Sequence, residues 1–215
     1  MERNKELKSQ MPRICLVSSG DEAGEQSGRL ETQLTLLPHH LPCIVQIREK
    51  RLSTHELLRL AHRMKLLTLS KKVLLVINER VDIALAAALD GIHLPENGCS
   101  PMVLRPLAPT MLFGCSVHSF EASQVAEESG ADYLIFGPIF DTPSKRPYGP
   151  PQGLEKLRRL CQSTTLPVFA LGGVGPENAE RCMAEGAYGV AALALFMDTI
   201  RFIDTIEQLY HTVTP

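Results

Sequence analysis

One histidine, His118, stands where the apolar run LFGCSV ends and a helical pattern begins. An imidazole titrates near neutral pH, so a histidine held at the end of a buried strand can both accept and return a proton. A lone histidine is nevertheless more often a structural or surface residue than a catalyst. His118 is therefore an acid–base candidate whose function depends on what the rest of the chain places around it.

Three further polar residues, Gln46, Arg48 and Lys50, alternate in the stretch QIREK. Every second side chain of a β-strand points to the same face, so this spacing predicts that the three share one face. Arginine binds phosphate through a planar pair of hydrogen bonds and lysine adds a point charge, which indicates an anion site. An internal salt bridge, for example between Arg48 and Glu79, is the alternative interpretation.

Short apolar runs alternate with stretches of helical spacing along the chain. The runs are ICLVS, IVQI, VLLVI, GIHL, LFGCSV, YLIFG, PVFALGG and GVAALAL, and the helical stretches include THELLRLAHRMKLL, RVDIALAAALD, SFEASQVAEESG, GLEKLRRLCQS and PENAERCMAEG. Such strands imply burial on both faces, and the alternation implies parallel pairing through right-handed crossovers. The sequence predicts an α/β fold, a closed (β/α)₈ TIM barrel. A doubly wound open sheet is the alternative, because the helices expected near 24–37 and 101–107 are weakly patterned.

The ends of these elements and of the domain follow from local signals. We expect a flexible segment over residues 1–11, which lack periodicity, and a single barrel domain over residues 12–215. Ser53 and Ser119 each precede a helical stretch, as N-cap residues do.

A parallel barrel carries its active site at the C-terminal ends of its strands. Polar residues at those positions are the site candidates: Gln46, Arg48, Lys50, Asn78, Glu79, His93, Glu96, Ser116, His118, Thr142, Ser144 and Lys145. The last three lie within the segment DTPSKRPYGPPQG, residues 141–153, whose basic and turn-forming residues predict a lid that closes over an anion.

Paired glycines, Gly172 and Gly173, end the seventh run and precede a helix expected to start near Pro176. Backbone N–H groups at such a turn bind phosphate, and barrels often build a phosphate site from the loops after their seventh and eighth strands. We therefore expect these glycines, with Leu193 and Ala194 after the eighth run, to bind phosphate.

The composition narrows the choice of partner. The chain has 215 residues and a formal net charge of -2, without the basic excess that favours nucleic-acid binding. No apolar stretch is long enough to span a membrane, and the charged start MERNKELKSQM lacks the apolar segment of a secretory signal. The six cysteines are scattered without metal-binding spacing. We expect a cytoplasmic protein with reduced thiols and small-molecule partners, and nothing in the sequence excludes a homo-oligomer.

Over nearly all of its length the sequence resembles the thiamin phosphate synthase/TenI family. The matching stretches are QIREK, INERVDIALAAALDGIHL, SVHSFEASQVAEESGADYLIFGPIFDTPSK and PVFALGGVGPENAERCMAEGAYGVAALA. The resemblance implies a (β/α)₈ barrel that takes part in thiamin biosynthesis and binds a thiazole phosphate. Members either join a pyrimidine pyrophosphate to a thiazole phosphate with Mg²⁺, as synthases do, or aromatise a thiazole carboxylate phosphate without a metal, as TenI-type tautomerases do.

The carboxylates expected of a synthase are incomplete. The resemblance places Glu79 at the position of one metal-binding aspartate and Gly98 at the position of the other, and a glycine offers Mg²⁺ no side-chain oxygen. We therefore predict a metal-independent thiazole tautomerase that needs no cofactor. The alternatives are a Mg²⁺-dependent thiamin phosphate synthase, with Glu79 and possible compensation by Glu96, and a regulator that binds thiamin phosphates without catalysis.

The resemblance also assigns roles to the candidate residues. It implies that His118 transfers the proton and that Ser116 and Thr142 position the substrate. In a synthase Gln46, Arg48, Asn78 and Lys145 would bind the pyrophosphate. Ser144 stands where threonine is frequent, and Ala194 stands where serine is frequent in the phosphate loop.

Overall fold

Eight parallel strands close into a barrel in the order β1 to β8, with β1 paired to β8. The computed structural model describes residues 10–22, 28–142, 150–193, 195 and 197–214. The strands are β1 Ile14–Val17, β2 Cys43–Ile47, β3 Val73–Asn78, β4 Gly91–Leu94, β5 Leu112–Val117, β6 Tyr133–Phe136, β7 Val168–Leu171 and β8 Gly189–Ala192. The predicted (β/α)₈ barrel is confirmed and the open-sheet alternative is wrong. Residues 1–9, most of the segment expected to be flexible, lie outside the described residues.

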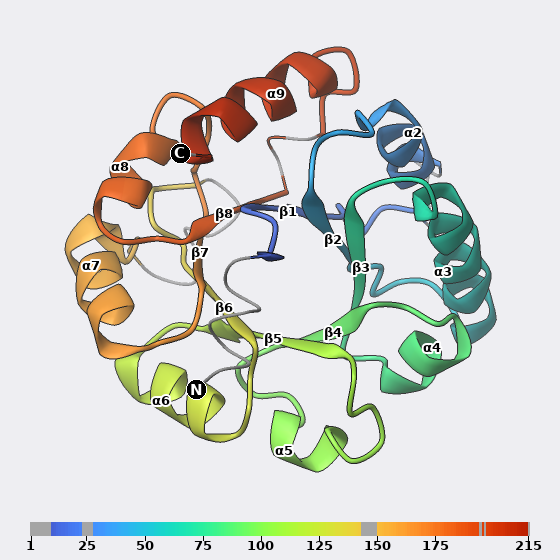
Figure 1. The fold of residues 1–215 in the computed structure, drawn as a ribbon, viewed down its shortest axis with the longest axis horizontal. Helices are drawn as coiled ribbons and strands as arrows, with labels where there is room; N and C mark the ends of the chain where they lie inside the picture. Colours follow the sequence, from blue (N-terminus) through green and yellow to red (C-terminus); the bar gives the residue numbers. More distant parts are fainter. Residues whose placement is uncertain (1–9, 23–27, 143–149, 194, 196, 215) are drawn as a thin grey trace.

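A ring of helices surrounds the strands (Figure 1). They are α2 Arg29–Leu36, α3 Thr54–Thr68, α4 Val81–Ala86, α5 Pro101–Leu104, α6 Phe120–Glu128, α7 Gly153–Ser163, α8 Ala179–Ala184 and α9 Phe202–Val213. The last helix, α9, lies in a stretch for which no helical pattern was named above. Its buried residues, Phe202, Ile206, Leu209 and Val213, nevertheless recur at helical spacing, which was the available signal.

The strands divide the core into two shells because successive side chains point to opposite faces. In β1, Ile14 and Leu16 pack with the helices, whereas Cys15 and Val17 belong to a separate cluster inside the barrel. The same alternation turns Gln46, Asn78, His93 and Ser116 inward, because their neighbours along each strand belong to the outer cluster. It is thus the hydrophobic pattern that sends these polar side chains toward the barrel axis.

Helix starts follow local side-chain chemistry. Ser53 forms a reciprocal capping box with Glu56, and the Ser119 hydroxyl accepts from the N–H of Ala122, so both predicted N-caps are confirmed. The predicted helix near Pro176 begins only at Ala179 and has six residues. The two helices whose patterns were weak are also short. α5 ends at Leu104, and the described part of the first predicted helix starts at Arg29.

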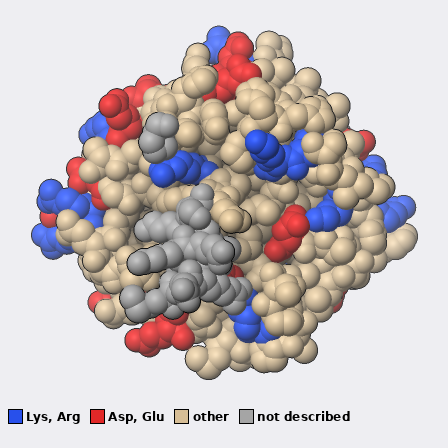
Figure 2. All heavy atoms as spheres, viewed as in Figure 1, with Lys and Arg blue, Asp and Glu red and all other residues tan. Residues whose placement is uncertain are grey.

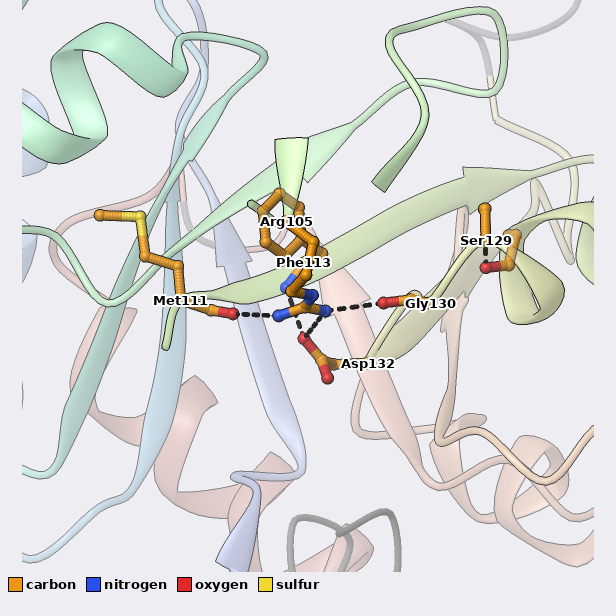
Figure 3. Close-up of polar contacts among 7 residues, drawn as sticks. Arg105, Met111, Phe113, Ser129, Gly130 and Asp132 are labelled. Carbon is orange, nitrogen blue, oxygen red and sulfur yellow. Dashed lines mark hydrogen bonds and ion pairs between the residues drawn. The ribbon is translucent and has the colours of Figure 1, made fainter. Parts of the chain in front are cut away.

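At the amino ends of the strands, Asp132 links neighbouring segments (Figure 3). The residue directly precedes β6, and one carboxylate oxygen accepts from the N–H of Phe113 in β5 at 2.8 Å and from the Arg105 guanidinium at 2.9 Å. Arg105 also donates to the carbonyls of Met111 and Gly130, and its guanidinium lies 4.2 Å from the centre of the Phe113 ring. This arrangement joins the segment after α5 to β5 and to the start of β6.

The face seen in Figure 2 carries basic and acidic side chains interspersed, and neither sign gathers into one large patch. This distribution agrees with the small net charge. Within the described part of the chain, no helix has the length and apolar character needed to cross a membrane.

Candidate active site

A chain of side-chain hydrogen bonds crosses from β2 to β3 at the carboxyl end of the barrel. The buried Gln46 amide donates to Asn78 Oδ1 at 3.1 Å, and Asn78 Nδ2 donates to Glu79 Oε2 at 2.7 Å. The Asn78 amide thus accepts through its oxygen and donates through its nitrogen, which orients the next group. Two predicted binding residues, Gln46 and Asn78, therefore fix the carboxylate of a third, Glu79.

The backbone of Glu79 is also held in place. Its φ of 63° lies in the left-handed region, which is uncommon for a residue with a side chain. Its N–H donates to the carbonyl of His93 in β4 at 3.0 Å. Such a conformation costs about 1–3 kcal/mol, persists only where the surroundings enforce it, and tends to occur at functional sites.

The QIREK pattern is corrected by the end of β2. The strand stops at Ile47, so Arg48 and Lys50 lie beyond its last residue and Lys50 is exposed. Glu49, which lies between them, is buried. Of the three predicted residues only Gln46 therefore lies within the strand, and the alternation of a strand does not apply to Arg48 and Lys50.

Arg48 does not form the internal salt bridge that was the alternative interpretation. Both residues are described, and no ion pair joins Arg48 to Glu79 in that part of the chain. Burial lowers the pKa of His93 inside the barrel, and the positive charge of Arg48 lowers it further. The predicted anion site thus retains one cation close to the barrel interior.

Glu49 was missed by the sequence reasoning and has a structural role. Its carboxylate accepts from the Ser18 hydroxyl at 2.5 Å and from the N–H groups of Gly20 and Glu22 at 3.1 and 3.0 Å. The Ser18 oxygen in turn accepts from the N–H of Arg48 at 2.8 Å. Glu49 therefore fastens the loop after β1 to the end of β2 and supports the backbone that carries Arg48.

Inside the barrel, His93 lies between two hydroxyl groups. Its Nε2 lies 2.8 Å from Ser116 Oγ and its Nδ1 lies 3.2 Å from the Tyr133 hydroxyl. Burial, with a smaller contribution from Arg48, lowers the pKa of His93 to about 3. The imidazole is consequently neutral near pH 7 and cannot serve as an acid there. Sequence reasoning named His93 and Ser116 but gave no signal for Tyr133.

His118 faces a carboxylate from the neighbouring loop. Its Nδ1 lies 2.6 Å from Glu96 Oε2, and its side chain is 56% exposed. The carbonyl of His118 accepts from Gln152 Nε2 at 3.2 Å, which anchors the backbone. A carboxylate that binds one ring nitrogen fixes the orientation of the imidazole. Glu96 was a predicted site candidate, but its spacing in the sequence gave no sign that it contacts His118.

Gly98 completes a tight turn that presents Glu96. Its N–H donates to the carbonyl of Pro95 at 2.8 Å. A Cβ atom at Gly98 would lie 2.9 Å from Pro95 Cδ and 3.0 Å from the Pro95 carbonyl oxygen. The turn therefore leaves no room for a side chain at Gly98, and an aspartate cannot be placed at this position without moving the turn.

The glycines after β7 are required by both conformation and space. Gly172 and Gly173 have φ values of 97° and 66°, and added Cβ atoms would lie 2.5 Å from Pro138 Cβ and 2.7 Å from Phe140 Cβ. Asn178 closes the loop by donating to the carbonyl of Gly173 and accepting from the N–H of Gly175. The loop backbone, rather than the six-residue α8, is therefore the feature available to a phosphate.

Leu193 follows β8 and packs against the inner cluster, beside the β7 end in the barrel order. Ala194, Ser144 and Lys145 lie outside the described residues, as does the 143–149 part of the predicted lid. Thr142 is described, and its buried Oγ1 has no hydrogen-bond partner there. A buried hydroxyl without a partner is costly, so Thr142 is a suitable contact for a ligand.

The described residues contain no group of three histidine, cysteine or acidic side chains able to hold a metal ion. The carboxyl end instead offers two separate carboxylates, Glu79 and Glu96, each oriented by a neighbouring side chain. Among the described residues of this end, protein ligands alone therefore do not form a metal site.

Comparisons with known proteins agree with this architecture. The model of the thiamine monophosphate synthase family matches residues 14–195. An Aquifex aeolicus protein named "Putative thiamine-phosphate synthase 2" is 40% identical over 189 residues, covering 88% of this chain and all of the relative. A thiamine-phosphate synthase of Moorella thermoacetica is 34% identical over 171 residues, covering 79% of this chain and 81% of the relative.

Among solved structures, the thiamine phosphate pyrophosphorylase from Pyrococcus furiosus superposes with a TM-score of 0.81 at 28% identity. The match covers 96% of this chain and 97% of that chain. The family model thus spans all eight strands, and the sequence relatives match over most of their lengths. On these grounds the chain belongs to the thiamine monophosphate synthase family.

Proposed function

We propose that this protein joins hydroxymethylpyrimidine pyrophosphate to thiazole phosphate, the reaction of thiamin phosphate synthases. The relatives described above carry synthase names, and they favour the synthase alternative of the sequence analysis over the tautomerase. The observation that carries the proposal is the Gln46–Asn78–Glu79 hydrogen-bond chain, which fixes a carboxylate at the barrel mouth. A tautomerase that works without metal has no evident need for a carboxylate held in this way.

The residues fit Mg²⁺ in the form in which enzymes of phosphorylated substrates usually bind it. Mg²⁺ is commonly held by one or two carboxylates, with water and substrate phosphates supplying the other oxygens. Glu79 would be the protein ligand, and the strained backbone and the Asn78 amide restrict where its carboxylate lies. When bound, Mg²⁺ would offset the negative charge that develops on the departing pyrophosphate.

The residues of this chain supply orientation and charge. Coupling forms a bond between the thiazole nitrogen and the pyrimidine methylene carbon while the bond from that carbon to pyrophosphate breaks. Arg48 would bind the pyrophosphate through its positive charge, and Lys145 would add a second cation. The glycine loop after β7 would bind the thiazole phosphate through its backbone, and Ser116 would position the substrate at the centre of the mouth.

The direct test is a coupling assay with both substrates at saturating Mg²⁺ and again with excess EDTA. We expect thiamin phosphate to form with Mg²⁺ and its formation to stop with EDTA. Absence of coupling by folded protein at every Mg²⁺ concentration would refute the proposed function. A calorimetric titration with inorganic pyrophosphate and Mg²⁺ adds a measurement that does not depend on turnover, and tight binding is expected only when both are present.

The His118–Glu96 pair favours thiazole tautomerisation as a second candidate. The 2.6 Å contact orients an exposed imidazole that a substrate can reach, and a positioned acid–base group contributes about 10²–10⁴-fold to proton transfer. Removal of the ring C2 proton and protonation of the exocyclic carbon require no metal.

If tautomerisation is the activity, it continues in EDTA, and His118→Asn removes most of it while product affinity changes by less than about tenfold. If coupling is the activity, His118→Asn leaves the Mg²⁺ requirement in place. Assaying both reactions with the wild type and with His118→Asn therefore separates the two candidates.

A further inference from the structure

Three inward-facing side chains from adjacent strands form a continuous line inside the barrel. Tyr133 of β6 contacts His93 of β4, and His93 contacts Ser116 of β5. The contact between β6 and β4 passes over Gly114 of β5, which is paired in register with both His93 and Tyr133. A Cβ at Gly114 would lie 2.0 Å from Tyr133 Cζ, so the absence of a side chain there makes the contact possible.

The direction of the hydrogen bonds follows from counting donors and acceptors. A phenol has one proton, and Tyr133 is fully buried, so that proton needs an acceptor. The nitrogen of His93 that faces it, Nδ1, can accept only if it carries no proton. Leaving the phenol proton unbonded would cost about 1–3 kcal/mol, which favours the arrangement in which Tyr133 donates to Nδ1.

Neutral histidine carries its proton on one ring nitrogen, so the proton must then lie on Nε2. Both side chains are buried, with His93 2% and Tyr133 0% exposed, and a charged form of either would be poorly solvated there. Nε2–H therefore donates to Ser116 Oγ at 2.8 Å. The proton of the Ser116 hydroxyl is left to point to another partner at the mouth.

We propose that Tyr133 and His93 are positioning residues that make Ser116 a hydrogen-bond donor toward an acceptor atom of the substrate. The arrangement also excludes Ser116 as a nucleophile activated by His93, because Nε2 already carries a proton and cannot take the one on Ser116. The hydrogen-bond direction depends only on these three side chains. The contribution to catalysis applies to whichever of the two reactions the protein performs, and so rests on the proposed function.

The direction can be measured without activity. Two-bond ¹H–¹⁵N correlation spectra of ¹⁵N-histidine-labelled protein at pH 7 distinguish protonated from unprotonated ring nitrogens, and His93→Gln identifies the His93 signals. We expect a protonated Nε2 and an unprotonated, hydrogen-bonded Nδ1. A protonated Nδ1 in the wild type would overturn the proposal, and this measurement needs no variant of Tyr133 to fold.

Two variants show whether Tyr133 sets the direction. Tyr133→Phe removes the donor, so the His93 signals should shift toward a mixture of both tautomers. Tyr188→Phe is the matched control, because Tyr188 also lies in the inner cluster but its hydroxyl donates to the carbonyl of Met11. This control should leave the His93 signals unchanged. If the His93 signals shift in both variants, the barrel interior has loosened in general, which would contradict a specific effect of the Tyr133 hydroxyl.

The effect on the substrate is measured by a double-mutant cycle on kcat/KM. We expect a loss of about threefold to tenfold for Tyr133→Phe, a larger loss for Ser116→Ala, and no further loss when the two are combined. Independent losses that multiply in the double variant would overturn the positioning role. Absence of both reactions in the wild type would refute the proposed function, while the NMR result would still decide the direction of the hydrogen bonds.

Discussion

Asp90 and Asp132 at the amino end of the barrel differ from Glu79 and Glu96 at the carboxyl end in whether a lysine or arginine pairs with them. At the amino end, Asp90 and Asp132 each accept from a backbone N–H of the preceding strand and from a cation in the helical layer. At the carboxyl end, Glu79 and Glu96 are oriented by an amide and an imidazole. No lysine or arginine pairs with either glutamate in the described part of the chain. Charge is thus neutralised within the protein at one end and left for a ligand at the other.

This contrast separates stability from function along the barrel axis. Paired charges at the amino end join strands to helices, whereas the carboxylates at the carboxyl end are positioned without being neutralised. The barrel can therefore lose the charge of Glu79 or Glu96 and remain folded, but loss of a buried amino-end charge leaves its partner uncompensated. The following predictions test this division.

The largest expected effect is on catalysis. Glu79→Gln keeps the shape of the side chain but removes the charge that would hold Mg²⁺, so the rate of coupling should fall by about 10²–10³-fold. The free energy of unfolding should remain within about 0.5 kcal/mol of the wild type, or rise, because a like-sized neutral group relieves a carboxylate that lacks a cation. Rate assays and urea denaturation measure the two quantities.

Glu121→Gln is the matched control for this substitution, since Glu121 is an exposed glutamate in the first turn of α6. It should change neither quantity appreciably. Full activity of Glu79→Gln would remove Glu79 from the metal site and leave Glu96 as the remaining carboxylate at the mouth.

At the amino end, Asp132→Asn should act on stability alone. The Asp132 side chain is 4% exposed, and the substitution leaves the Arg105 guanidinium facing an amide. Because removing one partner of a buried pair is costly, we expect the free energy of unfolding to fall by about 3 kcal/mol. The kcat/KM of the folded enzyme should stay within about twofold of the wild type. The exposed pair between Arg80 and Asp82 is the control, and Asp82→Asn should cost less than about 1 kcal/mol. A catalytic defect in fully folded Asp132→Asn would contradict the division.

The sequence predicted the fold because the barrel is encoded in local patterns. All eight strands lie where apolar runs occur, since a strand buried on both faces needs apolar residues throughout. Exact ends were harder to predict, because they depend on tertiary contacts. Thus QIREK continues the alternation in sequence, but the strand stops at Ile47, and the buried Glu49 binds backbone N–H groups of the loop after β1.

The candidate site was predictable as a set of residues but not as a set of contacts. Location at strand ends identified Asn78, Glu79, Ser116 and His118. Sequence spacing cannot show that Asn78 orients Glu79 or that Glu96 reaches His118 from a different loop. The tautomerase prediction relied on Gly98 as a missing ligand. The structure gives that glycine a steric role in the Pro95–Gly98 turn, so its presence no longer decides between the reactions.

A third prediction concerns the pH dependence of stability that arises from His93, whose burial keeps it neutral. Its pKa is about 3 in the folded protein and about 6.5 in an unfolded chain. Between these values the unfolded state binds the extra proton, so stability is fully present above pH 6.5 and is lost as the pH falls toward 3. At pH 5 the contribution from His93 should be about 2 kcal/mol lower than at pH 8.

The effect of His93 is isolated by comparing urea denaturation of the wild type and His93→Gln at both pH values. The variant lacks the titrating group, so its stability should fall less between pH 8 and pH 5. Equal losses in the two proteins would show that folded His93 titrates normally, contrary to its buried environment.

The smallest effect compares the two amino-end carboxylates with each other. Asp90 repeats the arrangement of Asp132: it directly precedes β4, accepts from the N–H of Leu75 in β3 at 2.8 Å and receives Lys65 Nζ at 2.9 Å. The pair is more open, however, with the Lys65 and Asp90 side chains 26% and 29% exposed. Lys65→Met keeps the length of the aliphatic stem and removes the charge, so Asp90 retains its backbone bond and can be hydrated. Because water can replace the lost cation, we expect the free energy of unfolding to fall by only about 0.5–1 kcal/mol, measured by urea denaturation at low and at 0.5 M salt, with the difference from the wild type shrinking at high salt. A loss as large as that of Asp132→Asn would mean that the backbone bond, and not the burial of the pair, determines the contribution of these carboxylates to stability.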